Sequence, residues 1–246
     1  MSPFGRAFAD GDRLSVAGAV VTLKVHRRAR RVSLRLDRAR GEIVATAPSL
    51  RRLHEAAAFA RERASWIAER IAELPEVAPV RPGLTLQVFG ETVRLESAAG
   101  RARWLHATEH YPARIAAMGE GEGYARAVVL VLKKRALEVL TERTAHYAGV
   151  LGAPMPKVAV ADAKGRWGSC RPGRQGQPGS IRYSWRLALA PFEVADYVAA
   201  HECAHLLELN HGPKFWAHVR RLVGEPAAHR DWLRAEGAKL HAFGRM

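Results

Sequence analysis

Two histidines enclose a glutamate in His201-Glu202-Cys203-Ala204-His205, which matches the pattern H-E-x-x-H. Residues four apart on an α-helix lie about 40° apart around the axis and about 6 Å apart along it. Two imidazoles at this spacing can bind one tetrahedral ion, with Zn–N distances near about 2.0–2.1 Å. Glu202 is one position further on, so we expect it to flank the ion without binding it.

This arrangement suits the hydrolysis of a peptide bond. A catalytic zinc ion usually keeps three protein ligands and one open position, which holds a water whose pKa falls to about 7. Glu202 could take a proton from that water as it attacks a carbonyl, and later deliver a proton to the leaving amine. The pattern therefore predicts a hydrolase, a zinc-dependent metallopeptidase with Glu202 as general base.

The third ligand has to come from outside the helix. Glu208 lies further along the same face, where three groups in one straight row cannot converge on an ion. His211 fits better, because Asn210 can end the helix in the left-handed conformation and Pro213 can begin the next one. Glu225 is the competing carrier, but its neighbours Gly224 and Pro226 indicate a surface turn. We expect His201, His205 and His211 to bind Zn²⁺.

The elements around this motif can be predicted from the pattern of apolar residues. The helix with the two histidines should begin at Pro191, whose missing N–H costs nothing in the first turn. A longer helix is expected from Tyr124 to Ala148, and residues 171–179 are expected to form a loop. Two strands are expected between these elements, at Lys157 to Ala161 and Ile181 to Ala188.

The N-terminal part is predicted to be rich in strands. Val32 to Asp37 alternates apolar and polar residues and forms a hairpin with Glu42 to Thr46. A helix should follow from about 50 to 74, with Ser49 as its N-cap. The three prolines of Pro75 to Gly83 indicate a linker. Further strands are expected at Leu84 to Phe89, Thr92 to Leu95 and Arg103 to Ala107, and no internal repeat is evident.

Composition indicates a cytoplasmic globular protein. Hydrophobic residues make up 48% and charged residues 26% of 246 residues. We expect no membrane span and no signal peptide, because the longest aliphatic run is Val128 to Leu132 and Met1 to Asp12 lacks an apolar core. With Cys170 and Cys203 as the only cysteines, no disulfide framework is expected. The sequence does not predict an oligomeric state.

Several segments together resemble the YgjP-like family of small zinc metallopeptidases, which is similar to the SprT-like proteases. The segments that carry the resemblance are His201 to Leu206, Asn210-His211, Phe215-Trp216, Arg166-Trp167-Gly168-Ser169-Cys170, Ile181 to Pro191, Asp196-Tyr197-Val198, Arg31 to Leu36 and Trp66-Ile67. The resemblance spans most of the chain. Cys203 departs from it, because the family more often has a bulky aliphatic residue there, and we expect this thiol to pack in the core.

The resemblance implies an α+β fold, with a β-rich N-terminal region at 1–110 and a zincin-like domain at 111–246 whose zinc helix packs on a small sheet. It also implies His201, His205 and His211 as ligands and Glu202 as base. Arg166 to Cys170, or the strand after it, could hold a substrate backbone by β-augmentation, or Trp167 could simply pack in the core with Gly168 making a turn. The oxyanion could be stabilised by Tyr183, Tyr197, Arg166 or His229.

Three functions fit these observations. The first is a peptidase acting on proteins or peptides, and the second is a SprT-like protease acting on proteins held on DNA. The third is a basic nucleic-acid-binding module with a structural zinc, which would have no need for Glu202. The net charge of +15 permits DNA association, although a bias toward arginine codons would also explain it. Basic residues are densest from Val21 to Arg40.

Overall fold

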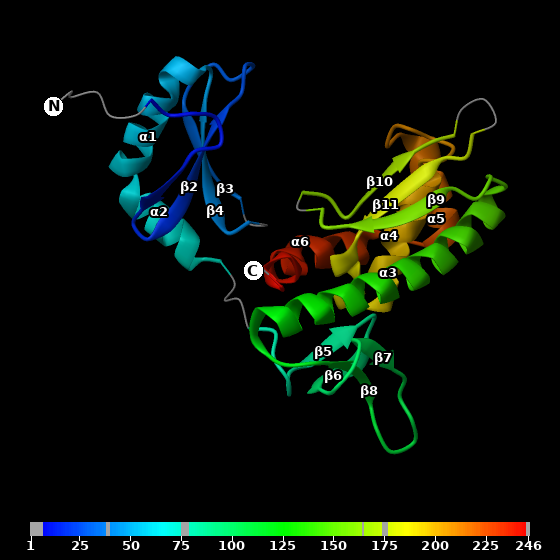
Figure 1. The fold of residues 1–246 in the computed structure, drawn as a ribbon. Helices are drawn as coiled ribbons and strands as arrows, with labels where there is room; N and C mark the ends of the chain where they lie inside the picture. The colour runs from blue at the N-terminus through cyan, green and yellow to red at the C-terminus, as the bar shows by residue number, and fades with distance from the viewer. Residues whose placement is uncertain (1–6, 38–39, 75–78, 164, 174–176, 245–246) are drawn as a thin grey trace. The chain divides into compact units, whose positions relative to one another are not determined.

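The computed structural model describes residues 7–37, 40–74, 79–163, 165–173 and 177–244 of the chain. Helices and three small sheets alternate along it, which confirms the expected α+β class (Figure 1). The chain forms two compact units, Met1–Glu76 and Val77–Met246. Arg6, Arg38, the start of the expected Pro75 to Gly83 linker and the centre of the 171–179 loop lie outside the described residues.

The first unit is a four-stranded sheet covered by two helices. Its strands are β1 (Arg13–Val16), β2 (Ala19–Val25), β3 (Ser33–Asp37) and β4 (Glu42–Ala47), in the order β1-β2-β4-β3. The expected β3–β4 hairpin is confirmed, with Leu34 opposite Ala45. β2 and β4 pair in parallel between the two antiparallel pairs.

One interrupted helical segment follows this sheet, where the sequence predicted a continuous helix from 50 to 74. It consists of η1 (Leu50–Arg52), α1 (Leu53–Glu62) and α2 (Ala64–Ala72). The break is at Arg63, whose φ of −99° and ψ of 26° are not helical. Ser49 precedes η1 but makes no side-chain capping bond. The apolar face of α1 still packs on the sheet, because Leu53 and Ala56 are fully buried with Leu23 and Ile43.

The second unit begins with a sheet of the same topology. Its strands are β5 (Thr85–Val88), β6 (Glu91–Ser97), β7 (Arg103–Leu105) and β8 (Ala113–Ala117), in the order β5-β6-β8-β7. Again the central pair is parallel, the outer pairs are antiparallel, and a helical segment follows the last strand. The expectation of no internal repeat is therefore wrong at the level of the fold.

The first hairpin turn of each four-stranded sheet has the same backbone conformation and a similar sequence. Ala17 and Gly18 both have positive φ, 50° and 77°, and so do Phe89 and Gly90, at 52° and 80°. Two consecutive residues with positive φ make the type I′ turn that matches the twist of a two-residue hairpin. A valine precedes each turn, so Val-x-Gly marks the corresponding position in both halves.

A long helix joins this sheet to the rest of the second unit. α3 (Gly121–Leu151) packs on β8 and on a three-stranded sheet of β9 (Lys157–Ala161), β10 (Gly168–Arg171) and β11 (Ser180–Ser184), in the order β10-β11-β9. The remaining elements are η2 (Trp185–Leu189), α4 (Phe192–Ala204), α5 (Pro213–Val223) and α6 (Ala227–Ala242) (Figure 1). The expected strand at 181–188 ends at Ser184, where the chain enters η2.

The boundary between the two compact units lies between residues 76 and 77, whereas the sequence suggested a boundary between residues 110 and 111. The difference arises because the sheet of β5 to β8 shares one core with α3. Val93, Leu95 and Ile115 are buried with Val128 and Leu132 of that helix. No helix in the described part of the chain has the length and apolarity needed to span a membrane.

Candidate metal centre

α4 positions the first histidine and the glutamate in its last turn. Most of its residues are buried, as expected for a helix that is apolar on nearly all sides and is surrounded by other elements. The helix starts after Pro191 and ends at Ala204, so His205 is the first residue beyond it, still with right-handed φ and ψ. Because His205 continues the helical path for one more residue, the two imidazoles keep the spacing that the motif requires.

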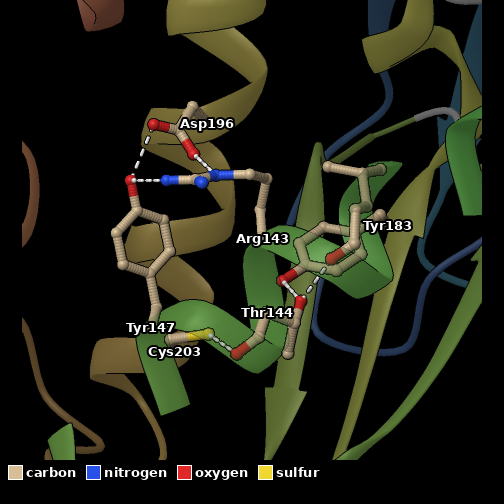
Figure 2. Close-up of polar contacts among 7 residues, drawn as sticks. Arg143, Thr144, Tyr147, Tyr183, Asp196 and Cys203 are labelled. Atoms are coloured by element: carbon tan, nitrogen blue, oxygen red, sulfur yellow. Dashed lines mark hydrogen bonds and ion pairs between the residues drawn. The ribbon is translucent and has the colours of Figure 1, made fainter. Parts of the chain in front are cut away.

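A network of side chains ties α4 to α3, as Figure 2 shows. The Arg143 guanidinium of α3 donates to Asp196 of α4 at 2.6 Å, and the Tyr147 hydroxyl donates to the same carboxylate at 2.6 Å. Lower down, Thr144 bonds the Tyr183 hydroxyl of β11 at 2.9 Å, and the Cys203 thiol contacts the Thr144 carbonyl at 3.8 Å. These contacts fix the rotation of α4 about its axis.

The three histidines of the motif converge. Their donor nitrogens all lie within 4.8 Å of one another, and the Nε2 atoms of His201 and His211 are 3.2 Å apart. Two nitrogens bound to one tetrahedral ion at about 2.0–2.1 Å are separated by about 3.3 Å, so the observed spacing fits zinc. Among the described residues, this is the one group of His, Cys, Asp and Glu side chains close enough to hold an ion.

Neighbouring groups orient the rings. Nδ1 of His205 lies 2.9 Å from the Glu208 carbonyl, and Nδ1 of His201 lies 3.4 Å from the Tyr197 hydroxyl. In each case the contact uses Nδ1 and leaves Nε2 for a ligand, which is how outer partners usually fix a metal-binding histidine. The buried Phe215 ring lies beside all three imidazoles, with centroid distances of 4.9, 4.5 and 4.7 Å.

Burial favours the neutral form of His201 and His205, which is the form that binds metals. The pKa of His201 is lowered to about 4, mainly by burial and to a smaller extent by the charges of His205, His211 and Arg230. Burial also lowers the pKa of His205, an effect that its bond to the Glu208 carbonyl partly opposes. A neutral imidazole keeps the lone pair that coordinates zinc, so the donor set has the chemistry of a zinc site.

The reversal that brings His211 back differs in detail from the expected one. The helix ends at Ala204, six residues before Asn210, and Asn210 does not have the positive φ expected of it. A tight turn instead bonds the Gly212 amide to the Asn210 carbonyl at 2.7 Å. Pro213 begins α5 as expected, and Phe215 in its first turn is fully buried.

Glu202 is 5% exposed, and no hydrogen bond or ion pair involves its carboxylate among the described residues. Burial raises its pKa to about 7, while the charge of Arg166 opposes this rise. An unpaired buried carboxylate is costly to a fold unless a cation or a reacting group faces it. Its place beside the three histidines is therefore consistent with the expected function as a general base.

The position of Glu202 also explains why residue 168 of the edge strand β10 is a glycine. A Cβ added to Gly168 would lie 2.6 Å from the carboxyl carbon of Glu202 and closer still to Oε1. Real Cβ atoms essentially never come so near another heavy atom. Gly168 thus allows the strand to lie directly against the carboxylate.

We expect Gly168→Ala to displace Glu202 and lower peptidase activity by about a hundredfold, because a shift of about 1 Å can cost that much. Bound zinc should stay at the wild-type level, since the three atoms nearest to the added methyl all belong to Glu202, which is not one of the three histidine ligands. The measurement is kcat/KM together with zinc content. Gly149→Ala is the matched control, because a Cβ there meets open space. Equal kcat/KM values for the two variants would show that Gly168 has no such role.

The other residues that the sequence offered for the oxyanion or for the third ligand lie in different surroundings. Tyr183 is fully buried and bonded to Thr144, so its hydroxyl is not available to a substrate. Tyr197 contacts His201, and its ring stacks on His229 at 5.8 Å. Glu225 is exposed in the turn between α5 and α6, outside the histidine group.

The cysteines and Trp167 are part of the packing around the site. Cys203 is fully buried, as expected, while Cys170 is half-buried in β10 and burial raises its pKa to about 12. Trp167 stacks on His241 at 4.6 Å and lies against Gly237 of α6. Trp167 therefore packs against α6, and the strand β10 that follows it still lies at the edge of its sheet. The two alternatives offered for this segment do not exclude each other.

The model of the YgjP-like metallopeptidase domain matches residues 30–236, which is most of the sequence. The chain belongs to the YgjP-like metallopeptidase family. The match begins in the connection between β2 and β3 of the first unit and ends in α6, so it covers part of each unit and the histidine cluster. Comparison with curated proteins and with solved structures found no match.

Proposed function

We propose that the chain is a zinc-dependent peptidase whose metal is held by His201, His205 and His211. The observation that carries the proposal is the convergence of three imidazoles beside a buried, unpaired carboxylate. A site with only a structural zinc usually has four protein ligands and needs no such carboxylate. The family membership supports the same reaction class.

Zinc bound at this site would supply Lewis-acid polarisation of the scissile carbonyl and of the attacking water. The chain contributes the proton transfers. A Glu202 carboxylate oxygen accepts the proton of the attacking water, and the same oxygen then delivers it to the amine nitrogen as the peptide bond breaks. Tyr197 and the Glu208 carbonyl keep His201 and His205 in fixed orientations during both steps.

The edge strand β10 would hold the substrate. β10 pairs only with β11 among the described strands, so its other edge keeps backbone donors and acceptors for an extended peptide. Gly168 allows the face of this strand to lie against Glu202. A peptide added to this edge would thus pass beside the base with its backbone already ordered, which lowers the entropy lost in the reaction.

A protease screen tests the proposal, with zinc content measured on the same samples. The substrates are an unfolded protein, a folded protein and a protein bound to DNA. We expect cleavage of the unfolded protein, because an edge strand binds only extended chain. Zinc-loaded protein that cleaves none of the three would contradict the proposal.

A second candidate function is proteolysis of proteins held on DNA, as in SprT-like proteases. The observation that favours it is the connection between β2 and β3, where Arg27, Arg28, Arg30 and Arg31 are all exposed. None of the four has an ion-pair partner among the described residues. Unpaired exposed arginines on one short loop suit a phosphate backbone.

If this loop binds DNA, the affinity should fall steeply with salt, because each phosphate contact releases a counterion. Replacing Arg27, Arg28, Arg30 and Arg31 together by Ser should reduce the slope of log K against log salt by up to about four. The measurement is fluorescence anisotropy on duplex DNA over a range of salt concentrations. Arg51 and Arg61, which are exposed on η1 and α1, provide the control substitutions. Absence of binding at low salt would leave composition as the explanation of the charge.

A further inference from the structure

Arg230 of α6 lies at the edge of the histidine cluster. Its guanidinium stacks over the Trp216 ring, 4.8 Å from the centroid. Trp216 in turn contacts two of the three histidines, with centroid distances of 6.1 Å to His201 and 6.1 Å to His211. The indole is thus a shared neighbour of the guanidinium and of the histidines.

The guanidinium has no anion to neutralise it. In the described part of the chain, Arg230 makes no ion pair and no side-chain hydrogen bond, although it is only half-exposed. Arg234, one turn further along α6, pairs with Asp231 at 2.8 Å. Stacking on an indole holds the plane of a guanidinium but leaves its edge N–H groups free to donate. Arg230 therefore presents an ordered set of unused donors.

The charges around the cluster also favour an anionic ligand. The charge of Arg230 acts on His201 and on Tyr197, and the charge of Arg166 acts on Glu202. Neither arginine has an ion-pair partner among the described residues. A divalent cation on the histidines would add to this positive potential. Such a site attracts a negatively charged ligand.

We propose that Arg230 binds a carboxylate group of the substrate next to the scissile peptide bond, an inference that rests on the proposed peptidase function. The fork of N–H groups on a guanidinium matches the two oxygens of a carboxylate, and such pairs form short, charge-assisted hydrogen bonds. The carboxylate can come from a substrate C-terminus or from an Asp or Glu side chain. Either source would make Arg230 a determinant of specificity.

Peptides of one sequence distinguish the two sources. One pair ends in a free carboxylate or in an amide, and a second pair carries Glu or Gln beside the cleaved bond. The enzymes are the zinc-loaded wild type, Arg230→Met, Arg230→Lys and the control Arg234→Met. Met keeps an unbranched stem that can pack on Trp216, and Lys keeps the charge but loses the fork. Zinc content is measured for every variant.

For the wild type, we expect kcat/KM to be at least about tenfold higher on the carboxylate member of one pair than on its neutral partner. Arg230→Met should remove that preference, because it should lower kcat/KM much more on the carboxylate peptide than on the neutral peptide. Arg230→Lys should keep only part of the preference, and Arg234→Met all of it. The pair that shows the preference identifies the source of the carboxylate.

Two outcomes would overturn the inference while leaving the peptidase function intact. One is equal rates on charged and neutral peptides, and the other is an equal loss on all peptides in Arg230→Met, which would indicate stabilisation of the oxyanion. If no peptide is cleaved, the peptidase proposal fails, and calorimetric binding of the same peptides to zinc-loaded Glu202→Gln decides about Arg230. Binding that does not depend on the carboxylate, or on Arg230, would then contradict the inference.

Discussion

Replacing Glu202 by Gln should nearly abolish peptide hydrolysis while leaving one zinc ion bound. The amide has nearly the same shape as the carboxyl group but cannot accept a proton at neutral pH. Loss of a general base lowers rates by roughly 10²–10⁴-fold, so kcat should fall by that factor. The measurement is kcat on a cleaved peptide, with zinc quantified in the same preparation.

Glu193→Gln is the matched control for this prediction. It makes the same chemical change on the same helix, but Glu193 is exposed in the first turn of α4, far along the axis from the histidines. We expect its kcat and zinc content to equal those of the wild type. A Glu202→Gln protein that has lost its zinc, or that cleaves at the wild-type rate, would disprove the assignment of Glu202 as base.

The second large effect should come from His211. With His211→Ala, two histidines remain, and zinc affinity should fall by more than about a hundredfold, since even the loss of an outer partner costs about 10–100-fold. His211 is exposed and lies in a loop, so the fold should survive the change. The measurement is competition for zinc with a chromogenic chelator, with circular dichroism as a check on folding.

Glu225→Ala is the corresponding control, because Glu225 is the alternative third ligand that the sequence offered. It is exposed and outside the histidine group. We expect this variant to keep both zinc affinity and activity. Strong loss of zinc in Glu225→Ala, together with normal affinity in His211→Ala, would reverse the assignment.

The sequence predicted local elements well where one pattern determines them. β9 was expected with the bounds that it has, and the hairpins β3–β4 and β5–β6 follow from alternating residues around Gly41 and Gly90. The long helix α3 followed from its apolar spacing. These features depend on short-range sequence, so a single chain is sufficient to predict them.

Pairings between distant strands were not predicted. β2 with β4, β6 with β8 and β9 with β11 are all parallel, and no turn sequence marks a parallel pair. The similarity of the two four-stranded sheets was also missed. Val16 to Gly18 and Val88 to Gly90 occupy equivalent hairpin turns, but Val150-Leu151-Gly152 at the end of α3 has the same pattern, so the pattern alone does not indicate the repeat.

For the site, the sequence predicted the reaction class and a group of three histidines that the structure brings together. The spacing of His201 and His205 required a helix, and Pro213 required the chain to begin a new one soon after His211. The surrounding contacts could not be predicted. Gly168 against Glu202, Arg143 with Asp196, and Arg230 over Trp216 join residues that are far apart in sequence or on different helices.

Zinc titration of metal-free protein tests the central claim most directly, with peptide hydrolysis and bound zinc followed in the same sample. If His201, His205 and His211 hold one catalytic ion, hydrolysis should be absent without metal, rise in proportion to added zinc and reach its maximum at one ion per chain. Undiminished hydrolysis by the metal-free protein would contradict the claim. The claim would also be contradicted if the protein binds one zinc ion per chain tightly but cleaves neither peptides nor an unfolded protein.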